Sequence, residues 1–147
     1  MQTSKQNLAQ IHTLDKLSHL LKALQEVKAK YEAFATGIKN TPLHQTIIGL
    51  AVESNQYASE LSSLIRSLGG EIPVINSKNE EKIEKKIAEK NVLAACQRTE
   101  MRLVKIYKDV LNESYVYDSL KKIISYQLNG VTCAFHKLKL LKGLQKQ

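Results

Sequence analysis

Four long stretches of this sequence place apolar residues at steps of three and four, and this periodicity constrains the fold more than any other feature. Such spacing puts the apolar side chains on one side of an α-helix. The predicted helices cover about residues 11–38, 42–68, 92–113 and 117–143. The broad apolar face of the second helix favours a bundle over a two-stranded coiled coil. The fold class predicted is therefore all-α, as a four-helix bundle.

Residues that begin or end helices lie between these stretches. The sequence Asn40-Thr41-Pro42 predicts an N-cap at Thr41 and the first helical position at Pro42. The two glycines and the proline of "LGGEIP" predict the end of the second helix. A short, highly charged helix is expected over about 79–90, and Asn91 is expected to cap the long helix that follows.

The connection between the second and third predicted helices, residues 69–91, is much longer than the other two. Eight extended residues reach about 26 Å, and a helix of about 12 residues adds about 18 Å. That length allows the chain to return along the bundle, so we expect a ferritin-like crossover with the second and third helices parallel. Simple up-down-up-down topology is the alternative. Residues 1–147 are predicted to form one domain.

Composition indicates a soluble chain that needs no disulfide. Hydrophobic residues make up 43% of the sequence, and there are only two prolines and six glycines. Cys96 and Cys133 form no CxxC motif and are expected to be small buried side chains in a reducing compartment. The N-terminus lacks an apolar signal core, and no run approaches the roughly 20 apolar residues of a membrane span. We expect a cytoplasmic protein that does not enter a membrane.

The net charge of +8 raises the question of nucleic-acid binding. The basic residues are 19 lysines and only three arginines, whereas arginine is the usual choice for bidentate phosphate contacts. A solvated lysine-rich surface is therefore the preferred interpretation, and nucleic acid is not expected as a partner. If nucleic acid does bind, the candidate residues are Lys82, Lys85, Lys86, Lys137, Lys139 and Lys142.

A ferritin-like di-iron centre needs an inward glutamate on two helices and Glu-x-x-His on the other two. No Glu-x-x-His occurs in this sequence, because the residues three positions before the four histidines are Ala9, Lys16, Thr41 and Cys133. The motif is local and cannot be assembled from distant segments. We therefore predict no metal site, no cofactor and no catalytic residue, and we identify no small-molecule substrate.

Uncharged polar residues occupy the mid-helix positions where metal ligands would project. Ser54, Thr99 and Gln127 are predicted to form a buried polar layer that fixes the helix register. Three glutamates flank the apolar stripes and are expected to be solvated or ion-paired. They are also the only candidates for an isolated metal-binding carboxylate: Glu32, Glu53 and Glu100.

The segments "SELSSLIRSLGGE" (59–71), "CQRTEMRLVKIYKDVL" (96–111) and "QLNGV" (127–131) resemble the YciE/YciF-like family of small bacterial ferritin-like proteins. The resemblance also takes in "YEAF" at 31–34 and spans most of the chain. It implies a ferritin-like bundle, often dimeric, associated with stress responses. Gln97 stands where the family usually has a glutamate beside the cysteine.

These observations predict a non-enzymatic ferritin-like bundle that acts as a stress-associated structural or interaction protein. A homodimer is expected, because the first helix carries apolar residues off its main stripe at Leu8, Ile11, Leu20, Val27 and Phe34. The alternative is a metal-binding oxidoreductase or storage protein with a degenerate iron or manganese site near the three flanking glutamates. A second alternative is a basic nucleic-acid-associated protein.

Overall fold

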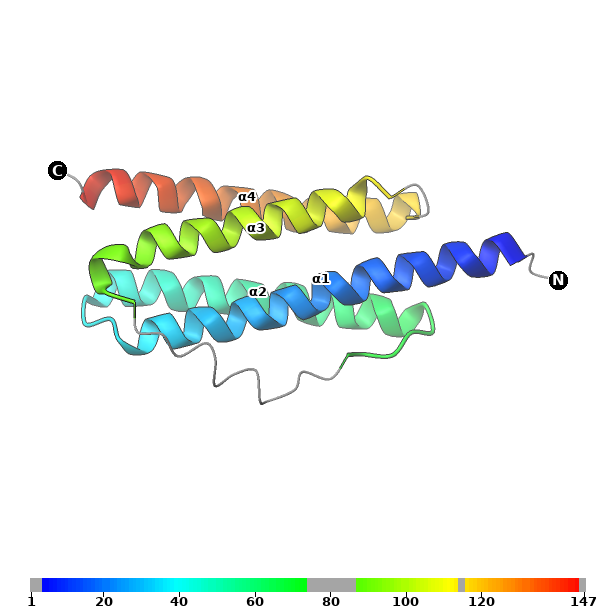
Figure 1. Ribbon diagram of the computed structural model, residues 1–147, viewed down its shortest axis with the longest axis horizontal. Helices are drawn as coiled ribbons and strands as arrows, with labels where there is room; N and C mark the ends of the chain where they lie inside the picture. The colour runs from blue at the N-terminus through cyan, green and yellow to red at the C-terminus, as the bar shows by residue number, and fades with distance from the viewer. Residues whose placement is uncertain (1–3, 74–86, 114–115, 146–147) are drawn as a thin grey trace.

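The structure is a computed structural model that describes residues 4–73, 87–113 and 116–145. Within these ranges the chain forms four long α-helices and one 3-10 turn, and it contains no strand (Figure 1). The prediction of an all-helical chain with four long helices is confirmed. The helices are α1 (Ser4–Thr36), α2 (Thr41–Ser67), α3 (Val92–Leu111) and α4 (Asp118–Gln145), and the 3-10 turn is η2 (Glu89–Asn91).

The helix bounds differ from the predicted ones mainly at two ends. Helix α1 begins at Ser4 rather than near residue 11, because its first turns extend beyond the apolar stripe that marked the helix in the sequence. Helix α3 ends at Leu111 rather than at 113. Most of the short helix expected over 79–90 lies outside the described residues. Its last part is a 3-10 turn, Glu89–Asn91, instead of an α-helix.

Two helix ends show how the local sequence determines the backbone. The N-cap of α2 is Asn40, one residue before the predicted Thr41, because the Asn40 side chain accepts a hydrogen bond from the Leu43 backbone N–H at 3.0 Å. At the other end, Gly69 adopts a φ of +83°, and the Gly70 N–H donates to the Ile65 carbonyl at 2.9 Å. This is the Schellman arrangement that the two glycines predicted. Asn91 stands at the start of α3, but its side chain makes no capping bond.

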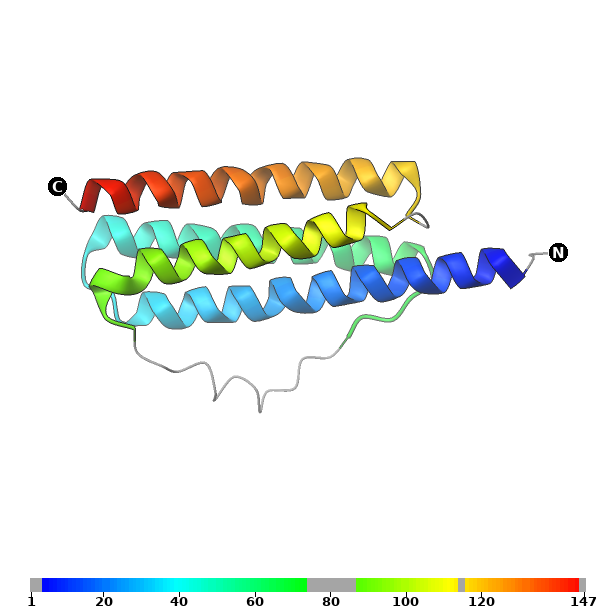
Figure 2. The same ribbon diagram turned by 45° about the horizontal axis from the view of Figure 1, so that its top comes forward.

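Helices α2 and α3 run in the same direction, and α1 and α4 run in the opposite one (Figures 1 and 2). Contacts at both ends of the molecule agree with this. At one end the Asn40 N–H, before α2, donates to the Glu89 carboxylate, before α3, at 3.0 Å. At the other end Lys16 of α1 pairs with Asp109, near the end of α3, at 2.7 Å. Helix α1 packs most extensively against α2, and α3 against α4.

One hydrophobic core takes residues from all four helices, among them Leu17, Leu24, Leu61, Leu103 and Ile124. Leu20, Val27 and Phe34 also belong to this core, with exposed fractions of 0%, 8% and 7%. The expectation that they form an exposed self-association face is wrong, because α1 packs against both α2 and α3 and buries more than one stripe. In the described part of the chain, no helix combines the length and the apolar character needed to cross a membrane.

Candidate functional site

The middle of the helical core contains polar side chains that the four helices enclose together. Among the described residues, the buried polar side chains are Thr13, Ser54, Thr99, Glu100 and Gln127. Three tyrosines lie buried among them, one each from α1, α2 and α3: Tyr31, Tyr57 and Tyr107. A buried polar group is costly unless it is hydrogen-bonded, so the partners of these side chains determine what the interior can do.

A hydrogen-bonded bridge centred on Gln127 joins three helices. The Tyr107 hydroxyl of α3 donates to Gln127 Oε1 of α4 at 2.7 Å. The Gln127 amide nitrogen donates to the Glu60 carboxylate of α2 at 3.0 Å, and it lies 3.3 Å from the Tyr57 carbonyl oxygen. Both Tyr107 and Gln127 are completely buried. The bridge therefore satisfies the Gln127 amide and fixes the register of α4 against α2 and α3.

Glu100 of α3 is the buried ionisable group of this region, with 3% of its surface exposed. The Tyr31 hydroxyl of α1 lies within hydrogen-bonding reach of the Glu100 carboxyl and 3.4 Å from the Cys96 carbonyl oxygen. The second carboxyl oxygen, Oε2, has no hydrogen-bond partner. Burial, and then the neighbouring Glu53 charge, raise the pKa of Glu100 from 4.5 to about 8. At neutral pH the carboxyl is therefore mostly protonated and uncharged.

Glu53 of α2 lies beside the same region but is only half buried. Burial raises the pKa of its carboxyl, while a hydrogen bond from the Tyr57 hydroxyl and the charge of Lys137 oppose that rise. Gly130 of α4 provides the space for this pair. A Cβ at position 130 would overlap the Tyr57 hydroxyl and lie 3.2 Å from Glu53 Oε1. A side chain at position 130 would therefore displace the Tyr57 hydroxyl from the α4 backbone.

A cleft of about 440 Å³ between α2 and α4 leads to Glu53 and Tyr57. Small residues open it, since Gly49 and Gly130 both contribute to its walls. Lys137 and Cys133 also line it. Cys133 is exposed, so the expectation that both cysteines are buried is wrong for Cys133 and holds for Cys96 alone. The cleft gives solvent a route to the half-buried carboxyl of Glu53, whereas Glu100 is sealed from solvent.

The structure buries all three residues of the predicted polar layer, but it gives each of them different surroundings. Gln127 makes the three-helix bridge, and the Thr99 hydroxyl donates to the Ala95 carbonyl of its own helix at 2.9 Å. Ser54 is 4% exposed. Within the described ranges no hydrogen bond joins any two of the three, so a mutually bonded layer is absent there.

The three flanking glutamates are separated by the structure. Glu32 is exposed and lies 3.4 Å from Lys28, one turn away on α1, as expected for a solvated carboxylate. Glu100, in contrast, is buried. The prediction that it lies at the solvated flank of its helix is therefore wrong. The sequence did contain a signal for this burial. The residues Leu93, Cys96, Glu100, Leu103, Tyr107 and Val110 follow steps of three and four, and all six are buried.

The residues present do not fit a di-iron centre. Such a centre uses four carboxylates and two histidines. Among the described residues, this interior offers one buried carboxyl, Glu100, two partly buried ones, Glu53 and Glu60, and no buried histidine. In the described part of the chain, no three side chains of His, Cys, Asp or Glu come together in a way that could hold a metal ion. Glu53 and Glu100, with their neighbouring tyrosine hydroxyls, are the oxygen donors closest to such a role.

Comparison with known proteins adds no family assignment. No protein-family model matches the chain, and no curated protein is significantly similar to it.

Proposed function

We propose that this chain is a ferritin-like four-helix bundle without enzymatic activity, acting in the cytoplasm as a stress-associated structural or interaction protein. The observation that carries the proposal is the Tyr107–Gln127–Glu60 bridge, which fills the middle of the core with hydrogen-bonded side chains. Two further observations support it. The parallel course of α2 and α3 suits a ferritin-like connection, and both cysteines are free thiols, as is usual in a reducing compartment.

The experiment that tests the closed interior is metal analysis. The protein is purified without chelator, incubated with Fe(II) or Mn(II) under anaerobic conditions, and passed through a desalting column. We expect far less than one metal ion per chain, and no change of melting temperature when EDTA is added. Stoichiometric metal that resists desalting would overturn the proposal.

Self-association belongs to the same proposal, although the surface for it is smaller than expected. Leu8 and Ile11, which are 55% and 53% exposed, are the members of the expected face that remain accessible. Both lie on the first turns of α1, which extend beyond the ends of the neighbouring helices (Figure 1). We expect light scattering to give the mass of a dimer and Ile11→Asp to give that of a monomer. A monomeric wild-type protein would remove self-association from the proposal.

A second candidate function, metal binding at a degenerate site, has one specific observation in its favour. Glu100 Oε2 lacks a partner, and Glu53 is close enough to influence the pKa of Glu100. Deprotonation of both carboxyls would give two negative charges for a hard cation such as Mn(II) or Fe(II). If metal is found, Glu100→Gln should abolish its retention. Glu32→Gln, at the exposed carboxylate, is the matched control and should leave it unchanged.

A further inference from the structure

The outer face of α3 gathers cations that form no ion pair within the part of the chain that the structure describes. Two of the three arginines in the chain, Arg98 and Arg102, lie one turn apart on this face, and Lys105 follows in the next turn. Lys30 of α1 lies close enough for both guanidinium groups to lower its pKa, in addition to the larger effect of its partial burial. Within the described residues the ion pairs lie elsewhere, at Lys16–Asp109 and Lys28–Glu32.

Clustered like charges of this kind are electrostatically unfavourable unless an anion joins them. From residue 98 to 105 the helix rises about 10 Å, since each residue adds about 1.5 Å. A single phosphate group would reach only part of that length. A chain of two or three phosphates would contact Arg98, Arg102 and Lys105 together, and arginine supplies the bidentate geometry that phosphate oxygens accept.

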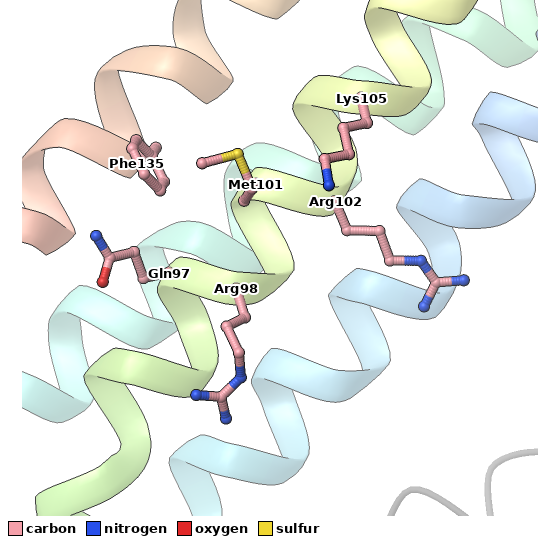
Figure 3. Close-up of a pocket in the computed structure, with 6 residues that line it drawn as sticks. All are labelled: Gln97, Arg98, Met101, Arg102, Lys105 and Phe135. Atoms are coloured by element: carbon pink, nitrogen blue, oxygen red, sulfur yellow. The ribbon is translucent and has the colours of Figure 1, made fainter.

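Groups suited to a planar ring lie on the other side of the same surface. Gln97, Met101 and Phe135 border a shallow groove of about 450 Å³ together with the three cations. Figure 3 shows the two arginine side chains extending from α3 over α1, while Gln97 and Met101 lie on the side of α3 that faces Phe135 of α4. An aromatic ring and a thioether pack well against a heterocycle, and an amide can hydrogen-bond its edge.

We propose that this face of α3 binds a nucleoside triphosphate, with the phosphates on Arg98, Arg102 and Lys105 and the base against Phe135 and Met101. The groove is shallow, so the bound ligand would stay partly exposed to solvent. The apolar half of the surface distinguishes this ligand from inorganic polyphosphate, which has no group to place there. It also distinguishes the ligand from duplex nucleic acid, whose backbone would leave Phe135 unused.

The test is calorimetric titration of the full chain with ATP and, separately, with inorganic tripolyphosphate, at low and at roughly physiological ionic strength. We expect both ligands to bind at low salt, with ATP the tighter by roughly fivefold or more from the contacts of its base. Arg98→Gln combined with Arg102→Gln should weaken both ligands by at least roughly tenfold, because charged hydrogen bonds are lost. Phe135→Ala should remove only the advantage of ATP.

Arg66→Gln is the matched control, because Arg66 is the third arginine and lies exposed at the end of α2. It should leave both affinities unchanged. Each substituted side chain is exposed or half-buried, and melting temperatures will show that the variants fold. The proposal is overturned by any of four results. These are no binding of ATP at millimolar concentration, equal binding of ATP and tripolyphosphate, an equal effect of Arg66→Gln, or tighter binding of a duplex oligonucleotide that Phe135→Ala does not weaken.

Discussion

The two faces of α3 treat charge in opposite ways. Among the described residues, Glu100 on the inner face is buried and forms no ion pair, and Arg98 and Arg102 on the outer face are exposed and form none either. Residues two positions apart on an α-helix point about 200° apart around its axis. Arg98 and Arg102 are each two positions from Glu100, so their side chains do not meet its carboxyl. The difference shows how each environment resolves an unpaired charge. The inner group takes up a proton, because its pKa is raised to about 8, whereas the outer groups stay charged in solvent.

The largest loss of stability should come from truncating a side chain on the inner face of α3. Tyr107→Ala removes a completely buried ring and leaves Gln127 Oε1 without its donor, so we expect a loss of roughly 4 kcal/mol in the free energy of unfolding. Lys105→Ala, two positions away on the outer face, should change it by less than about 0.5 kcal/mol. Urea unfolding measures both variants. Similar losses in the two would contradict the contrast between the faces.

The next largest difference between the two faces should appear when stability is measured as a function of pH. The pKa of Glu100 is raised in the folded state, so its carboxyl holds a proton over a range in which the unfolded chain has released it. The contribution of Glu100 to the free energy of unfolding should therefore be greatest below about pH 4.5. It should fall as the pH rises from about 5 to 8. The fall should not exceed about 1.4 kcal/mol per pH unit for one proton.

Glu100→Gln should reduce this pH-dependent loss of stability. The part of the loss that remains should come from Glu53, whose pKa is also raised by burial. Tyr31 and Cys96 face Glu100 as well, but burial raises the pKa of both groups, to about 12 for the Cys96 thiol, so neither titrates in this range. Arg98→Gln on the outer face should leave the slope of stability against pH unchanged. A wild-type protein whose stability rises from pH 5 to 8 would contradict the burial of a protonated Glu100.

A smaller effect should follow from filling the space at Gly130. Gly130→Ala forces the Tyr57 hydroxyl away from α4, and we expect a loss of roughly 1–3 kcal/mol from overpacking. Gly49→Ala is the control in the same cleft, since a Cβ there meets nothing within 4 Å. It should gain up to about 1 kcal/mol from helix propensity. Thermal or urea unfolding gives the sign of each change, and a gain in both would mean that Tyr57 moves at no cost.

The smallest perturbation is a thiol assay that leaves the sequence intact. Cys133 of α4 is exposed and should react quickly with Ellman's reagent. Burial raises the pKa of the Cys96 thiol to about 12, which leaves on the order of one thiolate in ten thousand at pH 8. One fast thiol per native chain and two in denaturant are therefore expected. Two fast thiols in the native protein would show that the inner face of α3 opens readily.

Much of the fold could be predicted from the sequence, because helix periodicity and turn residues are local signals. The end of α2 at Gly69 and Gly70 is an example, since the two glycines alone specify its geometry. The depth of burial on α1 was harder to predict. Whether Leu20 and Phe34 face solvent depends on how many neighbours α1 has, and periodicity along one helix carries no information about that number.

The candidate site was predictable only in part for a related reason. Gln127 could be identified as an inward polar residue, because it lies on the main stripe of its helix. Its partners Tyr107 and Glu60 come from two other helices, and no pattern within a single segment links them. Glu100 was expected at the flank because the apolar stripe was drawn through Cys96, Thr99, Leu103 and Ile106. The buried face of α3 is wider than that stripe and also includes Glu100 and Tyr107.

The uneven packing of the four helices has a consequence for the integrity of the chain. Helix α1 packs mainly against α2, and α3 mainly against α4. The molecule therefore consists of two helical hairpins joined by a single connecting segment. Each hairpin presents an apolar surface that the other covers, and each forms from sequence-local contacts. A backbone severed between residues 73 and 87 should therefore give two complementary halves that reassemble in solution, with Asn40 of one half again meeting Glu89 of the other.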